Sequence, residues 1–454
     1  MSSWAELEGL IFSGFEYYFL PGCISDIFPV VSFEKSRSQA YRPRIVDAEL
    51  GFLLEAAGAV VIEGPRGCGK TATARNAAAS EALLDVDEEM REAVTVNPTV
   101  VLNGEVPRLI DEWQLAPQIW NLVRRAVDDR RETGQFILTG SAVPKDDVTR
   151  HSGAGRFTRM RMRPMSLFEL GRSGGQVSLA RLLAGERPDS VSCEAPIEAI
   201  AEDIAVGGWP GLRDRSIPQA LRTLQGYLDE VSRVDVSRVD RTRRDPKRVE
   251  RLLESLARNV ASLAAATTLA ADAGGADGPL DNDTVREYLD VLERLMVVEN
   301  QPAWSAHLRS TYRLRRAAKR HFVDPSLAVA ALGGTPERIL REIRLFGLLF
   351  ESLVVRDLRI YAQAADAQVY HYRDSSGLEV DAIVEARDGS WAGFEVKLNP
   401  SRIDEAAANL SKFADRVDTS VSGEPRSLGV ITAGRFGYTL DNGVHVIPIN
   451  ALGP

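Results

Sequence analysis

Residues 64–71 read GPRGCGKT, which fits the pattern G-x-x-x-x-G-K-[ST] of a phosphate-binding loop. The motif follows the apolar, β-branched run Ala59–Ile62, which predicts a buried strand, and it opens a helical segment, Thr71–Ala82. This strand–loop–helix order is the context that the motif requires. Glycines let the loop turn its N–H groups inward, and the helix N-terminus adds partial positive charge. The sequence therefore predicts a site for the phosphates of a nucleotide.

Each residue type in this loop has an expected role toward ATP. Lys70 is expected to reach the β- and γ-phosphates, and the Thr71 hydroxyl to bind Mg²⁺. The chain has seven lysines among its 55 basic residues, so chance poorly explains a lysine at the demanded position. The backbone contacts to the phosphates are expected from Gly64, Gly67 and Gly69.

Two later segments supply the expected partners of the loop. Asp111 and Glu112 follow the apolar residues 108–110; the aspartate is expected to hold Mg²⁺ and the glutamate to polarise the attacking water. The strand Gln135–Thr139 leads to Ser141, which is expected to contact the γ-phosphate. Ligands of open α/β sheets bind at the carboxyl ends of the strands, so the three motifs are expected to converge there.

Arg156 is the candidate for neutralising charge in the transition state. It ends the sequence GAGR at residues 153–156, and it could act within its own chain or across the interface of an oligomer. The competing interpretation is a surface arginine in a chain rich in arginine.

The order of these motifs resembles a large family of bacterial and archaeal AAA-type P-loop ATPases that carry a C-terminal domain of unknown function. The resemblance rests on GPRGCGKT and on four later stretches: LIDEWQ at 109–114, LTGS at 138–141, PMSLFEL at 164–170 and GGWP at 207–210. It covers roughly residues 41–450. It implies an enzyme that hydrolyses ATP with Mg²⁺ as cofactor.

The expected fold class is a multidomain α/β protein. It combines a P-loop core with a parallel sheet, a helical and winged-helix middle, and a restriction-endonuclease-like α/β domain at the C-terminus. The expected divisions are an irregular extension (1–40), the ATPase core (41–163), a helical subdomain (164–246), a winged-helix-like domain (247–320) and a nuclease-like domain (321–454).

The middle of the chain offers two candidate contacts to nucleic acid. The amphipathic segment Asn282–Met296 resembles the third helix of a winged helix-turn-helix, but its four acidic residues would face phosphates poorly. Residues 309–320 carry six basic residues and no acidic one, so they are the better candidate. In both cases the alternative is a packing module or a solvated face.

The C-terminal part carries a pattern of two carboxylates and a lysine. Asp381 lies in one expected strand, and Glu395 and Lys397 lie on the same face of the next. Two carboxylates can hold Mg²⁺, the metal lowers the pKa of a bound water, and the lysine orients that water. Glu351, on the preceding helix, could complete the metal site.

This pattern resembles the PD-(D/E)xK restriction-endonuclease-like fold over about residues 336–450, with Val380-Asp381 in place of Pro-Asp. The resemblance implies metal-dependent cleavage of a phosphodiester by Asp381, Glu395 and Lys397. We therefore expect an ATPase coupled to a domain that cuts or binds nucleic acid. The alternative is a signalling or scaffold ATPase, a nucleotide switch whose nuclease-like domain is catalytically inactive.

Composition excludes several other classes of protein. The 454 residues are 44% hydrophobic and 26% charged, which is ordinary for a globular protein and excludes a mainly disordered one. The net charge of −9 excludes a uniformly basic nucleic-acid binder. No uncharged apolar stretch is long enough to span a membrane, and the three cysteines predict neither a disulfide framework nor a zinc site. We expect a cytoplasmic protein without a membrane partner.

Overall fold

The structure is a computed structural model that describes residues 41–140, 152–194, 196–236, 244–305 and 317–454. Residues 41–454 form one unit. The expected N-terminal extension, residues 1–40, lies outside the described residues, and so does Ser141.

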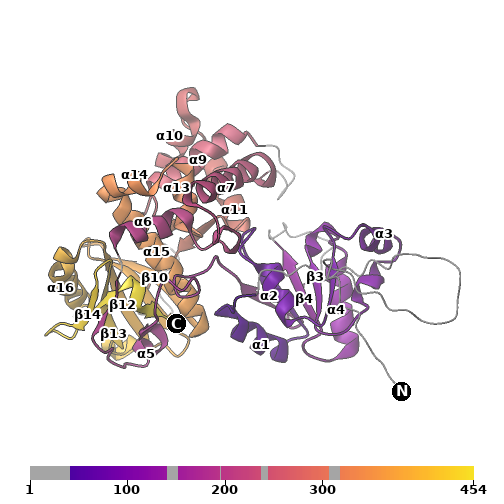
Figure 1. Ribbon diagram of the computed structural model, residues 1–454, viewed down its shortest axis with the longest axis horizontal. Coiled ribbons are helices and arrows are strands. Elements are labelled where there is room, and N and C mark those ends of the chain that lie inside the picture. Colours follow the sequence, from indigo (N-terminus) through magenta and orange to yellow (C-terminus); the bar gives the residue numbers. More distant parts are fainter. Residues whose placement is uncertain (1–40, 141–151, 195, 237–243, 306–316) are drawn as a thin grey trace, which may run out of the picture. The chain divides into compact units, whose positions relative to one another are not determined.

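The N-terminal part of the described chain contains a parallel five-stranded sheet in the order β2-β3-β4-β1-β5. Figure 1 labels β3 and β4 of this sheet and the helices α1 to α4 near it. Its strands are β1 (Ala59–Glu63), β2 (Ser80–Leu83), β3 (Arg108–Asp111), β4 (Phe136–Gly140) and β5 (Phe157–Arg161). The connecting helices and 3-10 turns are α1 (Val46–Ala56), α2 (Lys70–Ala77), α3 (Glu88–Val96), η1 (Pro98–Leu102), η2 (Trp113–Leu115) and α4 (Ile119–Arg130).

The strands of this sheet are buried on both faces. In β1, Val60 and Ile62 pack into one apolar cluster with residues of α1 and α2, whereas Ala59 and Val61 pack into a second cluster with residues of α4. Alternate side chains of a strand point to opposite faces, so a continuous apolar run requires helices on both. The sequence AVVI is therefore explained by a sheet layer between two helical layers.

Two features of this sheet differ from the sequence-based expectation. The helix expected over residues 71–82 ends at Ala77, because residues 80–83 pair with β3 and this pairing outweighs the helix propensity of the alanines. Strand β5 was not expected after Arg156. It lies at the edge of the sheet, where its arginines reach solvent, so it lacks an apolar run.

The middle of the chain is mostly helical. Its first part contains β6 (Val177–Ser178), α5 (Leu179–Leu183), β7 (Val191–Ser192), α6 (Ile197–Val206), η3 (Pro210–Leu212), α7 (Ile217–Glu230) and the π-helical η4 (Val231–Asp235). Three helices and a hairpin follow: α9 (Pro246–Arg258), α10 (Ala266–Gly274) with the turn η5 (Gly275–Asp277), α11 (Asn282–Arg294), β8 (Val298–Gln301) and β9 (Lys319–Phe322). Ser262, between α9 and α10, forms a β-bridge with Arg320 of this hairpin.

The C-terminal part is built on a mixed seven-stranded sheet. Its order is β10-β11-β12-β13-β15-β14-β7, with β10, β11 and β12 antiparallel and β13 and β15 parallel to β12. The strands are β10 (Ala367–Arg373), β11 (Glu379–Ala386), β12 (Trp391–Lys397), β13 (Ser427–Thr432), β14 (Phe436–Thr439) and β15 (His445–Pro448), and a further strand, β16 (Leu452–Gly453), pairs with β6. The helices and turns are α13 (Pro325–Ala331), α14 (Pro336–Arg341), α15 (Ile343–Ala364), η6 (Pro400–Arg402), α16 (Ile403–Ala414), α17 (Thr419–Ser422) and η7 (Ile449–Ala451).

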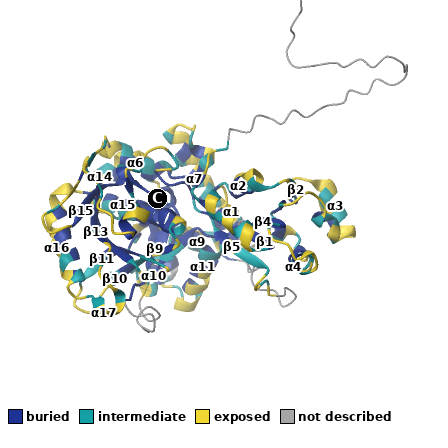
Figure 2. Ribbon diagram, turned by 90° about the horizontal axis from the view of Figure 1, so that it is seen from below, coloured by how far each residue is buried: buried dark blue, intermediate teal, exposed yellow. Residues whose placement is uncertain are grey.

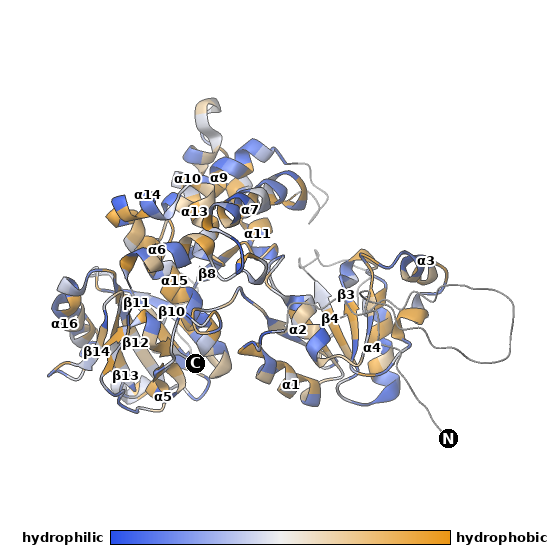
Figure 3. Ribbon diagram, viewed as in Figure 1, coloured by the Kyte–Doolittle hydropathy of each residue, from blue (hydrophilic) through white to orange (hydrophobic). Residues whose placement is uncertain are grey.

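The two faces of this sheet bury different apolar clusters. The cluster on one face includes Phe350 and Leu358 of α15, and the cluster on the other includes Leu410 and Phe413 of α16. The buried residues lie on the strands and the exposed ones on outer surfaces such as that of α16 (Figure 2). Helix α16 carries both hydrophobic and hydrophilic residues, as expected for a helix that covers the sheet (Figure 3). Helices thus enclose the sheet from both sides.

Residues 164–246 are not purely helical. Strand β7 extends the C-terminal sheet beside β14, and β6 pairs with β16. These strands are two residues long, too short for a period to show in the sequence. None of the helices in the described part of the chain has the length and apolarity needed to cross a membrane.

Candidate functional site

The phosphate-binding loop leaves the carboxyl end of β1 and enters α2 at Lys70. Gly69 has φ 105°, which favours glycine. At Gly64 an added Cβ would lie 2.3 Å from the carbonyl oxygen of Met162. Both glycines are therefore required by the path of the backbone.

Lys70 folds back over this loop. Its ammonium donates hydrogen bonds of 2.9 Å to the carbonyl oxygens of Gly64 and Pro65, and the side chain is almost fully buried. The positive charge is thus held within the concave loop, where phosphate oxygens could replace the carbonyls as acceptors.

Thr71 at the start of α2, Asp111 at the end of β3 and Thr139 near the end of β4 come together. The Thr71 hydroxyl donates to the two carboxylate oxygens of Asp111, at 3.0 and 3.1 Å. The Thr139 hydroxyl, at the end of β4, also donates to Asp111. Sequence reasoning placed the polar partner of this strand at Ser141 and missed Thr139, although both end the same apolar run.

Glu112 is held in an unusual backbone conformation beside this group. Its φ is 51° and its ψ is 44°, a left-handed conformation that is strained for glutamate. Its carboxylate accepts a hydrogen bond from the side-chain amide of Gln114. An added Cβ on Gly140 would lie 2.6 Å from the Gln114 oxygen, so the two polar side chains lie over the end of β4.

Arg156 lies at the opposite end of the sheet from the phosphate-binding loop. It precedes β5, whose first residue pairs with Ala59 at the start of β1, whereas the loop follows the end of β1. Its guanidinium donates to the carboxylate of Asp128 at 2.8 Å. Four or five strand residues span about 15 Å, so Arg156 does not reach the loop of its own chain. Its action across a subunit interface stays a prediction.

Two groups outside the predicted site pack against the loop. Arg44 donates to the carbonyl oxygen of Cys68 at 3.0 Å and forms a buried ion pair with Glu169. From the turn GGWP, the Trp209 ring approaches Gly67, and an added Cβ on Gly69 would lie 3.5 Å from Pro210. The sequence marked GGWP as a turn, but nothing in it indicated this contact.

The three predicted residues of the C-terminal pattern do meet. The Lys397 ammonium lies 3.3 Å from an Asp381 oxygen and 2.5 Å from a Glu395 oxygen. The second Glu395 oxygen accepts a hydrogen bond of 2.6 Å from Asn409 of α16. The Val396 N–H donates to Asp381 at 2.9 Å, which joins the two strands at this point.

A second lysine, which sequence reasoning assigned to a different role, completes this cluster. The Lys319 ammonium of β9 lies 2.7 Å from Glu351 and 3.3 Å from Asp381. Glu351 therefore does join the cluster, through a lysine. We call these five residues the carboxylate–lysine cluster: Lys319, Glu351, Asp381, Glu395 and Lys397.

The charged groups of the cluster shift the pKa values of their neighbours. Burial alone would raise the pKa of Asp381, but Lys319 and Lys397 outweigh it and hold that pKa well below its usual value. Burial and the nearby charge of Asp381 raise the pKa of Glu395 to about 8 and that of Glu351 to about 7. Asp381 is thus the carboxylate that both lysines keep ionised.

The cluster does not fit a divalent metal as it stands. Carboxylates bind Mg²⁺ through oxygens at about 2.0–2.1 Å from the ion, and here lysine ammonium groups lie between the carboxylates instead. Within the described residues, no group of three or more His, Cys, Asp or Glu side chains is arranged to hold a metal ion.

The basic segment 309–320 is only partly described. Lys319 is buried in the cluster, and Arg320 donates to the carbonyl oxygen of Ala264, so neither is available to phosphates. The four arginines between 309 and 316 lie outside the described residues. On α11, the exposed carboxylates of Asp283 and Asp290 form ion pairs with Arg286 and Arg294, so this face offers no excess of positive charge to phosphates.

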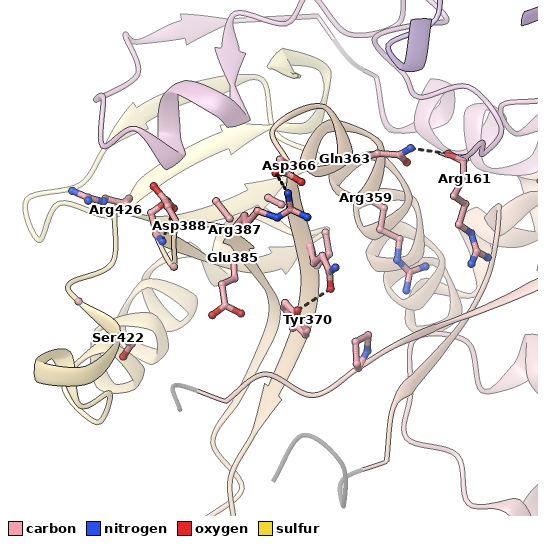
Figure 4. A pocket seen from close by; sticks show the side chains of 18 of the residues that line it. Arg161, Arg359, Gln363, Asp366, Tyr370, Glu385, Arg387, Asp388, Ser422 and Arg426 are labelled. Atoms are coloured by element: carbon pink, nitrogen blue, oxygen red, sulfur yellow. Dashed lines mark hydrogen bonds and ion pairs between the residues drawn. The ribbon is translucent and has the colours of Figure 1, made fainter. Parts of the chain in front are cut away.

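A polar cavity of about 1050 Å³ lies toward the far end of β11 from Asp381 (Figure 4). Within it Glu299 accepts from Arg163, and nearby Arg161 and Arg359 help hold the pKa of Glu299 well below its usual value against the effect of burial. Six arginines and six carboxylates line the cavity, so it has no net preference for an anion.

Three family models match separate parts of the chain. Residues 56–171 match the model described as an AAA domain. Residues 197–338 and 346–452 match two models described as domains of unknown function, DUF8612 and DUF4143. The match to DUF8612, over residues 197–338, crosses the domain boundary that the sequence predicted between residues 246 and 247. The N-terminal region is therefore similar to AAA-type P-loop ATPase domains, in agreement with its parallel sheet.

Among solved structures, the chain is similar to the Walker-type ATPase PABY2304 of Pyrococcus abyssi. The two are 12% identical, the match covers 63% of this chain and 94% of that chain, and the TM-score is 0.39. No curated protein matches the sequence.

Proposed function

We propose that this chain is an ATP-hydrolysing nucleotide switch whose C-terminal domain has a restriction-endonuclease-like fold but does not cut. The observation that carries the ATPase part is the meeting of Lys70, Thr71 and Asp111 at the carboxyl edge of the sheet. The cation, the hydroxyl and the carboxylate are the groups that P-loop ATPases bring to Mg²⁺-ATP.

The residues at this edge fit ATP and Mg²⁺. The loop has no room for a side chain at Gly64, so its backbone can approach the phosphates closely. Lys70 would bind the β- and γ-phosphates, and Thr71 and Asp111 would hold the metal. Bound Mg²⁺ neutralises charge that develops on the phosphates during transfer.

Glu112 and Gln114 are the groups assigned to the attacking water. They are hydrogen-bonded to each other at the end of β3, where a carboxylate can accept a proton from water and an amide can orient it. Thr139 fixes Asp111 from the neighbouring strand, which makes it a positioning residue. The strained backbone of Glu112 supports the assignment, because such strain is concentrated at functional sites.

The fold of the C-terminal domain is proposed from the order α15-β10-β11-β12-α16-β13, with three antiparallel strands followed by a parallel one. This is the order expected for a restriction-endonuclease-like core, and Asp381, Glu395 and Lys397 lie where its catalytic residues would. The lysines between its carboxylates favour the non-cutting alternative. Nucleic acid stays the proposed class of partner.

A buried polar chain supports the switch. Gly208, beside the Trp209 that approaches the loop, donates to Asp324 at 3.0 Å. Arg356 of α15 bonds Asp324 at 2.9 Å and also bonds Asp357. Helix α15 carries Glu351 as well. A continuous set of contacts therefore connects the phosphate-binding loop with the C-terminal domain, and a conformational change at the loop could be transmitted through it.

The test is ATP binding by calorimetry and hydrolysis by phosphate release, for the full chain and for Lys70→Ala. We expect Lys70→Ala to abolish both, because the buried cation that faces the loop carbonyls is removed. Lys412→Ala, at an exposed lysine of α16, is the matched control and should change neither. Unchanged affinity in Lys70→Ala would overturn the assignment.

The non-cutting part has its own assay. Single- and double-stranded DNA and RNA are incubated with the protein and Mg²⁺ or Mn²⁺, with and without ATP. We expect no cleavage above that of Asp381→Ala. Metal-dependent cleavage that Asp381→Ala removes would restore the nuclease interpretation and leave the ATPase assignment untouched.

A further inference from the structure

The cation that pairs with both Asp381 and Glu351 comes from outside the C-terminal sheet. Lys319 begins β9, opposite Gln301 of β8, in the hairpin that follows α11. Its side chain is 6% exposed, so its charge is almost entirely removed from bulk water. Removing an ammonium group from water costs free energy unless opposite charges pair with it. Here the carboxylates of Glu351 and Asp381 provide that pairing.

Lysines and other donors already occupy the inward-facing carboxylate oxygens. Asp381 Oδ1 faces Lys319, and its Oδ2 accepts from Lys397 and from the Val396 N–H. Glu395 Oε2 accepts from Lys397, and its Oε1 accepts from Asn409. Glu351 Oε1 accepts from Lys319. A divalent metal would have to displace lysine contacts to reach these oxygens.

The charges of the cluster are also nearly balanced without a metal. Two ammonium groups face three carboxylates. A metal in a carboxylate site normally supplies the positive charge that allows several carboxylates to ionise side by side. In this cluster the lysines supply it.

The hairpin that delivers Lys319 is built into the domain. Gln301 donates to the backbone oxygens of Asp381 and Tyr370, both at 2.9 Å. Trp304, shortly after β8, is 1% exposed and packs its ring against those of Trp391 and Phe413. The hairpin that carries Lys319 is therefore held against the C-terminal sheet by hydrogen bonds and by aromatic packing.

We infer that Lys319 is the resident cation of the carboxylate–lysine cluster and stands in place of a divalent metal, so that the cluster is an ionic joint between the β8–β9 hairpin and the C-terminal sheet. The inference rests on the proposed non-cutting role of the C-terminal domain and not on ATP hydrolysis. It assigns Lys319 a role that the D-E-K pattern alone does not contain.

The test measures the binding of Mn²⁺ to the nucleotide-free full chain. Binding is detected as a loss of the electron-paramagnetic resonance signal of free Mn²⁺. All samples carry Asp111→Asn, which removes the carboxylate assigned to the metal at the nucleotide site. We expect the added change Lys319→Met to tighten Mn²⁺ binding by about tenfold or more, because it removes the competing cation and keeps the volume. A further Asp381→Asn should abolish that gain, and Lys412→Met should produce none.

Two results would overturn the inference. One is Asp381-dependent Mn²⁺ binding when Lys319 is intact. The other is a folded Lys319→Met protein, with unchanged circular dichroism, that gains no Mn²⁺ binding. The ATPase assay of the same proteins without Asp111→Asn is read separately, so a failure of the ATPase assignment is not mistaken for a failure here.

A second measurement does not depend on the folding of Lys319→Met. Crystals of the unaltered protein are soaked in Mn²⁺, and the anomalous difference map is inspected at the cluster. We expect no peak between Glu351, Asp381 and Glu395, with the Lys319 ammonium at hydrogen-bond distance from Asp381. A Mn²⁺ peak bound by these carboxylates would contradict the inference.

Discussion

The Trp209 ring lies against Gly67 of the phosphate-binding loop: its Cε3 atom is 3.9 Å from the position that a Gly67 Cβ would occupy. The indole N–H of the same tryptophan donates a 2.9 Å hydrogen bond to the buried Ser326, which also bonds Asp324. Trp209 therefore contacts both the nucleotide loop and the buried polar chain that leads to α15.

This position predicts that Trp209→Phe weakens ATP binding, by about 0.5–2 kcal/mol, because the smaller ring loses the hydrogen bond that holds it against the loop. Affinity is measured by calorimetry. Trp391→Phe, in the C-terminal aromatic cluster, is the matched control and should leave ATP affinity unchanged. Equal affinities in the two variants would show that Trp209 does not support the loop.

Glu112→Gln should bind ATP normally and hydrolyse it more slowly, by roughly 10²–10⁴-fold, because the amide keeps the shape of the carboxylate but cannot accept the proton of the water. Single-turnover hydrolysis and calorimetry separate the two effects. Glu92→Gln, at an exposed glutamate of α3, serves as the control. A normal rate in Glu112→Gln would remove Glu112 from the mechanism.

Gly64→Ala should abolish ATP binding and lower thermal stability. The new methyl group would lie 2.3 Å from the Met162 carbonyl oxygen and 2.9 Å from the Cys68 sulfur, both buried, so the loop must shift. Gly226→Ala is the matched control, since nothing lies within 4 Å of an added Cβ there and alanine favours the helix α7. Nucleotide binding by Gly64→Ala with native affinity would contradict this account of the loop.

The buried His371 predicts a pH dependence of stability. Burial, together with the positive charge of Lys319, lowers the pKa of His371 from 6.5 to about 4. As the pH falls from 6.5 to 4, the unfolded chain binds a proton that the folded chain does not. The folded state therefore loses up to about 3 kcal/mol of stability from this group.

His371→Gln should lack this contribution. The difference in unfolding free energy between the two proteins, from urea titrations, should change between pH 6.5 and 4 and stay constant between pH 7.5 and 8.5. A difference that is independent of pH throughout would show that the pKa of His371 is the same in the folded and unfolded states.

Most of the nucleotide site could be predicted from short stretches of sequence. Residues 64–71 form a loop whose shape depends on local glycines, and Asp111 follows an apolar strand that must end near it. Thr139 shows the limit of this reasoning, because only the register of β3 against β4 places it beside Asp111.

Arg156 and Lys319 could not be placed from the sequence. An arginine after glycines is equally compatible with either edge of a sheet, and the pairing of β5 with β1 put Arg156 at the edge away from the loop. Lys319 lies in a run of basic residues, which predicts a side chain that is exposed to solvent or contacts phosphate. Its burial depends on the hairpin register that sets it opposite Gln301.

The sequence by itself determined the phosphate-binding loop, the parallel sheet around it and the strands that bear Asp381, Glu395 and Lys397. These depend on periodicity and on residues close together in the chain. Only the tertiary structure decided that Lys319 joins Glu351 and Asp381, and that Trp209 supports the loop. Such contacts join segments far apart in the sequence, and their free energy comes from burial and charge pairing, which no local pattern records.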